Sequence, residues 1–189
     1  MLAGSKHNER VAGVDHVSED RAPPSEPVLV AVCGYPGVGK STVAETLTEW
    51  LDATRLRTDA VRKELYDEPT YTSEESKIVY ETVMDRARER LADGPVVVDA
   101  SFADRRHRAQ AQQVARELTV PFRLLRVHCE QSVAIGRIRD REGISDADVE
   151  IYHHVKDSFD PLGAEHTTID NSGAWDQTVE QLRALSLGE

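Results

Sequence analysis

A glycine-rich segment between an apolar run and an amphipathic pattern constrains this chain more than any other feature. Residues 34–42 read Gly-Tyr-Pro-Gly-Val-Gly-Lys-Ser-Thr and satisfy the pattern G-x-x-x-x-G-K-[ST] at every required position. Glycines allow backbone conformations closed to other residues, so successive N–H groups can converge on one anion. A helix that follows adds its positive N-terminal end. The segment therefore predicts a loop that binds nucleotide phosphates.

The chemistry of this loop assigns a role to its two polar side chains. Lys40 can reach the β- and γ-phosphates and is expected to be catalytic, and Ser41 can place its hydroxyl on magnesium. We therefore expect Mg²⁺ as the cofactor and ATP as the co-substrate. The expected nucleotide-binding residues are Gly34, Tyr35, Pro36, Gly37, Val38, Gly39, Lys40, Ser41 and Thr42.

Short apolar runs alternate with helical patterns along the rest of the chain. Strands are predicted at Val28–Cys33, Thr54–Thr58, Pro95–Asp99, Phe122–Cys129 and Thr167–Asp170. Helices are predicted at Ser41–Leu51, from the capping box at Thr72–Glu75 to Gly94, at Arg105–Leu118, at Glu130–Asp140, from Ser145 to before Pro161, and at Trp175–Leu185. This alternation predicts an α/β fold of three layers, with a five-stranded parallel sheet covered by helices on both faces. Ligands of such sheets bind at the edge where the strands end.

Composition narrows the class of protein. The chain has 189 residues, which predicts one domain over residues 27–189 after an N-terminal tail at residues 1–26 that we expect to be disordered. The net charge of -11 argues against extended binding of nucleic acid, which needs a basic face. No apolar run approaches the ~20 residues needed to span a membrane, so we expect a cytoplasmic protein without membrane contact. Cys33 and Cys129 are expected to be buried thiols.

Two carboxylates are candidates for the chemistry. Asp59 follows the second predicted strand, where it could accept a proton from an attacking hydroxyl or orient it. A helix N-cap at Asp59 is the structural alternative, and the two roles are compatible. Asp99 ends an apolar strand, a position from which a carboxylate can hold magnesium directly or through water.

Arginines are the candidates for charge stabilisation. Arg137 and Arg141 are four residues apart and share a helix face, so they could neutralise a transferring phosphoryl group from a mobile flap. A solvated charged helix is the alternative. Arg62 lies close enough to Asp59 in the sequence to bind an anionic substrate or to pair with Asp59, and Arg105 follows the strand that ends at Asp99, where it could also contact the substrate.

Together these residues resemble a family of small P-loop kinases, the predicted kinases with an AAA-type ATP-binding domain. Polynucleotide kinase, gluconate kinase, the zeta toxins and chloramphenicol phosphotransferase are related to this family. The likeness covers about residues 27 to 173. It rests on Gly34–Thr42, on Thr58-Asp59 with Arg62-Lys63, on Val98–Phe102, on Arg137 with Arg141, and on Ser145–Ala147.

The resemblance implies a sheet order of 2-3-1-4-5 and a small helical lid. It also implies that Asp59 activates an acceptor hydroxyl and that Arg137 or Arg141 acts from the lid. The leading hypothesis is an ATP-dependent phosphotransferase acting on a hydroxyl of a small molecule or nucleic-acid end. A nucleoside or nucleotide kinase and a regulatory nucleotide-binding module stay open, as do the acceptor, the preference for ATP or GTP, and the oligomeric state.

Overall fold

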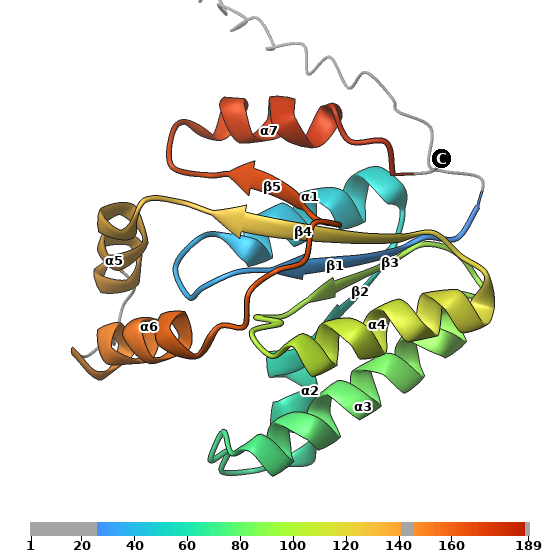
Figure 1. Cartoon of the computed structure of the whole chain (residues 1–189), viewed down its shortest axis with the longest axis horizontal. Helices are drawn as coiled ribbons and strands as arrows, with labels where there is room; N and C mark the ends of the chain where they lie inside the picture. The colour runs from blue at the N-terminus through green and yellow to red at the C-terminus, as the bar shows by residue number, and fades with distance from the viewer. Residues whose placement is uncertain (1–25, 141–145, 188–189) are drawn as a thin grey trace, which may run out of the picture.

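Five short strands form the centre of the molecule, and the computed structural model describes residues 26–140 and 146–187 around them (Figure 1). The strands are β1 (Leu29–Cys33), β2 (Thr54–Arg57), β3 (Val96–Asp99), β4 (Phe122–His128) and β5 (Thr167–Asp170). All neighbours pair in parallel, in the order β2-β3-β1-β4-β5. The α/β class and the strand order expected from the sequence are therefore confirmed.

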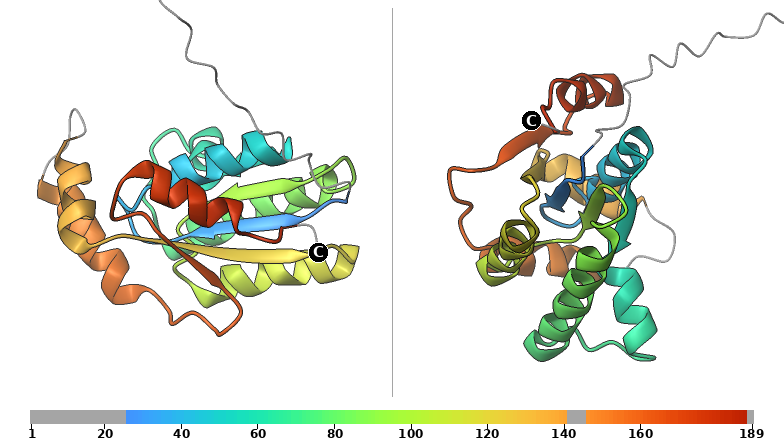
Figure 2. Two further views of the ribbon diagram at one scale, coloured as in Figure 1. Left: turned by 90° about the horizontal axis from the view of Figure 1, so that it is seen from above. Right: turned by 90° about the vertical axis from the view of Figure 1, so that its right-hand side faces the viewer.

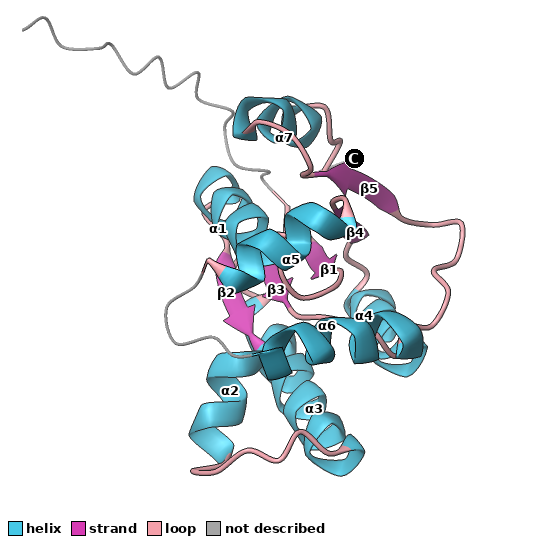
Figure 3. Cartoon of the chain, turned by 90° about the vertical axis from the view of Figure 1, so that its left-hand side faces the viewer, coloured by secondary structure: helices cyan, strands magenta, loops and turns pink. Residues whose placement is uncertain are grey.

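Helices cover both faces of this sheet. The helices are α1 (Lys40–Leu51), α2 (Thr58–Leu65), α3 (Ser73–Arg90), α4 (Arg105–Leu118), α5 (Gln131–Arg139), α6 (Asp146–Ser158) and α7 (Trp175–Arg183). Figures 1 and 2 show α1 and α7 on one face and α3 and α4 on the other. Figure 3 shows α5 and α6 together at the edge where the strands end. These two helices occupy the place where a helical lid was expected.

The central strand feeds two separate cores, which is why it reads as a continuous apolar run. Successive side chains of a strand point to opposite faces of the sheet. Val30 and Val32 pack into the core beneath α1 and α7. Ala31 and Cys33 pack into the core beneath α3 and α4. Burial raises the pKa of the Cys33 thiol to about 11.

The segment after β2 differs from the sequence expectation. Helix α2 begins at Thr58 with Arg57 at the N-cap position, so Asp59 lies within the first turn and is not the cap. The capping residue predicted for α3 is confirmed, since the Thr72 hydroxyl accepts a hydrogen bond from the Glu75 N–H at 3.2 Å.

Three expectations fall on residues outside the described part of the chain. The predicted tail at residues 1–26 lies there except for its last residue, and so do Arg141 and the helix start at Ser145. Within the described residues, every helix is too short or too polar to cross a bilayer.

Candidate active site

The glycine-rich loop joins β1 to α1 at the edge where the strands end. Gly37 and Gly39 have φ angles of 76° and 92°, in the left-handed region that favours glycine. The Lys40 ammonium donates a hydrogen bond to the Tyr35 carbonyl at 2.8 Å, which folds this side chain over the loop. Gly39 is the N-cap residue of α1 and has no side chain that could accept a hydrogen bond from the first N–H groups of the helix. The first N–H groups of α1 can therefore bind an anion.

Neighbouring elements leave no room for larger residues at the loop glycines. A Cβ atom at Gly37 would lie 2.5 Å from the Ala134 carbonyl of α5. A Cβ atom at Gly39 would lie 2.3 Å from the Asn171 side-chain nitrogen. The two glycines are thus required by close packing as well as by backbone conformation.

Asn171 fixes the loop from the far end of the chain. Its side chain is buried, and its Nδ2 donates to the Val38 carbonyl at 2.9 Å. Its Oδ1 accepts a hydrogen bond from the Thr178 hydroxyl at 2.9 Å, which fixes the orientation of the amide. Its position directly after β5 was the only sequence signal, and we did not predict this role for Asn171.

One lid arginine reaches the loop. Arg137 of α5 is half-buried, and its Nη1 lies 3.5 Å from the Val38 carbonyl. The same nitrogen lies 3.7 Å from the position of a Cβ atom at Gly39. The fold therefore brings Arg137 beside the segment that is expected to bind phosphates.

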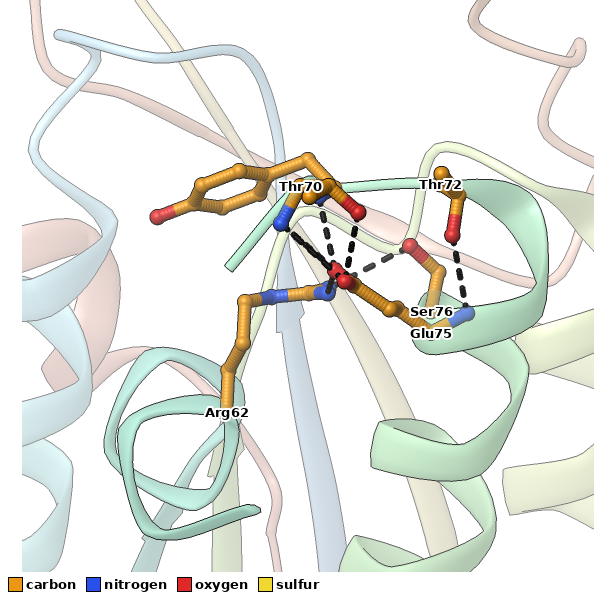
Figure 4. Close-up of polar contacts among 6 residues, drawn as sticks. Arg62, Thr70, Thr72, Glu75 and Ser76 are labelled. Carbon is orange, nitrogen blue, oxygen red and sulfur yellow. Dashed lines mark hydrogen bonds and ion pairs between the residues drawn. The ribbon is translucent and has the colours of Figure 1, made fainter. Parts of the chain in front are cut away.

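Asp59 and Arg62 lie on different sides of α2. Asp59 is exposed in the first turn of this helix. Arg62 is buried between α2 and α3, where its Nη1 lies 3.3 Å from a Glu75 carboxylate oxygen. It also donates to the Ser76 hydroxyl at 3.2 Å (Figure 4). The guanidinium lies 4.7 Å from the centre of the Tyr71 ring. The fold thus gives Arg62 a protein partner.

Arg105 and Arg108, both in the first turn of α4, have different surroundings. Arg105 is exposed, and its backbone N–H donates to an Asp160 carboxylate oxygen at 2.8 Å. Arg108, which we did not single out from the sequence, is buried and donates to the carbonyls of four residues. Those residues are Phe102, Ala103, Asp160 and Pro161, at 2.6, 2.9, 3.1 and 3.0 Å. Arg108 therefore ties the loop after β3 to the segment after α6.

Asp99 and the start of α1 are joined by an arginine that the sequence did not indicate. One nitrogen of Arg55, Nη2, donates to an Asp99 carboxylate oxygen at 2.8 Å and to the Ser41 carbonyl at 2.9 Å. Arg57 Nε lies 3.7 Å from the same Asp99 oxygen. The Asp99 side chain is only 5% exposed. This buried carboxylate therefore faces two guanidinium groups.

The oxygen donors at this point fit magnesium. A hydroxyl and a carboxylate are the hard ligands that Mg²⁺ prefers, and the ion usually completes its coordination with water and substrate phosphates. The Ser41 backbone carbonyl and the Asp99 carboxylate accept hydrogen bonds from the same Arg55 nitrogen, so the start of α1 lies beside Asp99. No group of three or more His, Cys, Asp or Glu side chains suited to a metal occurs among the described residues. A magnesium ion held by Ser41 and Asp99 would therefore take its remaining ligands from water and substrate phosphates.

Solved structures of known proteins share this fold. The gluconokinase from Sinorhizobium meliloti 1021 has a TM-score of 0.66 and 20% identity, covering 85% of this chain and 90% of that chain. The APS kinase CysC of Mycobacterium tuberculosis, solved with AMPPNP and APS, has a TM-score of 0.67 and 20% identity, with 85% and 100% covered.

Sequence relatives are longer than this chain. The uncharacterized proteins Rv2004c of Mycobacterium tuberculosis (strain H37Rv) and Mb2027c of Mycobacterium bovis are each 32% identical over 137 residues. The match covers 65% of this chain and 28% of each relative, so the chain spans less than a third of their length. Residues 29–162 match the family described as AAA domain. The chain therefore belongs to the AAA domain family and has the fold of the small P-loop kinases.

Proposed function

We propose that this protein is an ATP- and Mg²⁺-dependent phosphotransferase that moves the γ-phosphate to a hydroxyl of a small molecule or a nucleic-acid end. The observation that carries the proposal is that three groups follow strands at the edge where the strands of the sheet end. The loop follows β1, Asp59 follows β2, and Arg137 lies on the helix after β4, against the loop. A protein that only binds nucleotide needs the loop alone, whereas phosphoryl transfer also needs a residue that orients the acceptor and one that stabilises charge.

The loop holds the donor in this proposal. The N–H groups at the start of α1 and the Lys40 ammonium bind the β- and γ-phosphates, so Lys40 exchanges the Tyr35 carbonyl for a phosphate oxygen. Magnesium, when bound, would neutralise charge on the phosphates, and Ser41 and Asp99 are the residues that would hold it. Arg137 would stabilise the charge that develops on the transferring group, and Arg141 would assist it.

Asp59 acts on the acceptor side. Its exposed carboxylate can accept the proton of an attacking hydroxyl, or orient that hydroxyl toward the γ-phosphate. Arg62 and Arg105 are the proposed acceptor contacts. Because Arg62 is paired with Glu75, it would contact an acceptor only by exchanging that partner. The solved gluconokinase of similar fold supports an alcohol group as the acceptor.

The experiment is a transfer screen followed by one substitution. Phosphate labelled at the γ-position of ATP is offered with nucleosides, sugars, antibiotics and 5′-hydroxyl oligonucleotides, and any labelled product identifies the acceptor class. Asp59→Asn should then lower transfer by about 10²–10⁴-fold, the usual contribution of a general base, with ATP affinity unchanged. Lys40→Ala should weaken ATP binding itself.

Asp93→Asn is the matched control, because Asp93 is an exposed carboxylate in the turn before β3, at the opposite edge of the sheet. Full transfer by Asp59→Asn would refute the assigned base. Transfer to nucleosides or nucleotides alone would favour a nucleoside or nucleotide kinase. Tight ATP binding without transfer to any acceptor would favour the regulatory module.

A further inference from the structure

Two strand residues place positive charge at the proposed metal site. Arg55 and Arg57 are two residues apart on β2, so their side chains point to the same face of the sheet. They stand in register with Val97 and Asp99 of β3, and Val97 packs into the core beneath α1. Both arginines therefore lie on the α1 side, beside the end of β3.

The Arg55 contacts put a guanidinium nitrogen where a cation would bind. Nη2 bridges the Asp99 carboxylate and the Ser41 carbonyl, and Nη1 lies 3.6 Å from a Glu45 carboxylate oxygen of α1. The Arg55 side chain is 18% exposed, and its Nε is buried without a hydrogen-bond partner among the described residues. An unsatisfied buried donor costs free energy, and the contacts of Nη1 and Nη2 with Glu45, Asp99 and the Ser41 carbonyl offset this cost.

We propose that Arg55 is a positioning residue whose guanidinium occupies the place of a cation between Asp99 and α1. There it competes with a divalent metal ion for the Asp99 carboxylate. The metal ion therefore binds only together with the nucleotide phosphates. This inference rests on the proposed magnesium-dependent function. A metal ion alone must displace a charge-assisted hydrogen bond and approach two guanidinium groups. A polyphosphate brings the negative charge that offsets this repulsion. Nucleotide and metal affinities are then coupled, and the coupling is reciprocal.

The test measures metal binding in the absence of nucleotide. Mn²⁺ serves as the probe because it shares the preference of Mg²⁺ for oxygen ligands and its free form is quantified by electron paramagnetic resonance. Arg55→Gln should bind Mn²⁺ at least about tenfold more tightly than wild type, the factor that corresponds to losing one charge-assisted hydrogen bond. The increase in Mn²⁺ affinity caused by added ATP should be smaller in Arg55→Gln than in wild type.

Three further variants make the result specific. Arg88→Gln removes the same charge from ion pairs with Asp85 and Glu117 on α3 and α4, and it should behave as wild type. The double variant Arg55→Gln, Asp99→Asn should not show the increase in Mn²⁺ affinity expected for Arg55→Gln alone. Arg57→Gln alters a 47% exposed side chain with a longer contact to Asp99. It should give a smaller gain, and it provides the test if Arg55→Gln does not fold.

The outcomes separate this inference from the proposed function. Arg55→Gln binding Mn²⁺ as weakly as wild type, or a gain that persists without Asp99, would overturn the role of Arg55. If Arg55→Gln does not fold, a Mn²⁺ affinity of Arg57→Gln equal to that of wild type would likewise overturn the proposal. Failure of wild type to transfer phosphate in the acceptor screen would instead reject the phosphotransferase, and it would leave the metal titration unaffected.

Discussion

The buried arginine of α4 is predicted to be a major source of stability. Arg108 is 7% exposed and donates to four carbonyl oxygens, two in the loop after β3 and two in the segment after α6. Its guanidinium also lies 5.6 Å from the centre of the Phe159 ring. Arg108→Met keeps most of the apolar stem and removes all four donors. The carbonyls then lose their partners, although the chain that carries them can relax toward water.

The magnitude follows from these contacts. A hydrogen bond from a charged donor contributes about 1.5–3 kcal/mol, and an orphaned buried acceptor costs a similar amount. Allowing for relaxation of the two loops, we expect Arg108→Met to lower the free energy of unfolding by about 3–5 kcal/mol. With a urea m-value of about 1–3 kcal/mol per molar, the midpoint of unfolding should fall by at least about 1 M. Urea titration followed by far-ultraviolet circular dichroism measures this change.

A neighbouring arginine on the same helix provides the control. Arg106 pairs with Asp104, but its side chain is 79% exposed. Solvent screening weakens such an exposed ion pair, so Arg106→Met should lower the urea midpoint by less than half as much as Arg108→Met. Equal midpoints for Arg108→Met and Arg106→Met would show that the four carbonyl bonds do not stabilise the fold, and the reasoning would be refuted.

Two further predictions follow from the surroundings of individual titratable groups. Burial raises the pKa of Cys33 to about 11 and also raises the pKa of Cys129. The test uses a chromogenic disulfide reagent at about pH 8, below the ordinary thiol pKa of about 8.5. The reagent should label neither thiol in the folded protein and both thiols after unfolding. Rapid labelling of the folded protein would contradict the burial of these thiols. The side-chain hydrogen bond from Arg106 lowers the pKa of Asp104 to about 2. Because the folded pKa is depressed, the stabilising effect is present above about pH 4, the ordinary range of Asp, and is lost as the pH falls toward 2. The difference in thermal midpoint between wild type and Asp104→Asn should shrink across that window, and a difference independent of pH would exclude this linkage.

Local patterns were sufficient to predict most elements of the fold. The strands were predicted within one residue. The apolar runs of β1 and β3 are buried on both faces, whereas β2 and β5 are short and largely polar. The glycine-rich loop was recognisable because its chemistry depends on nine consecutive residues. Helix α2 was not predicted because it is only eight residues long and mostly polar. Its buried residues are Thr58, Val61 and Arg62, so it has no apolar stripe that the sequence could reveal.

The surroundings of the candidate site residues could not be obtained from local patterns. Arg62 looked available for a substrate, but the start of α3 brings Glu75 against it. Asp99 looked like an uncomplicated metal ligand, but β2 places Arg55 beside it from 44 residues away in the sequence. In both cases the partner is selected by packing between elements, which the sequence near each residue does not encode.

The sequence by itself determined the phosphate-binding loop, the parallel α/β architecture and the positions of Asp59, Asp99 and Arg137 after particular strands. These features depend on contiguous residues and on the rule that parallel strands end at one edge of a sheet. The tertiary structure alone decided that Asn171 supports the loop from 133 residues away and that a guanidinium shares Asp99 with the start of α1. Such contacts depend on strand register and side-chain packing, because only folding sets the distance between residues that are far apart in the chain.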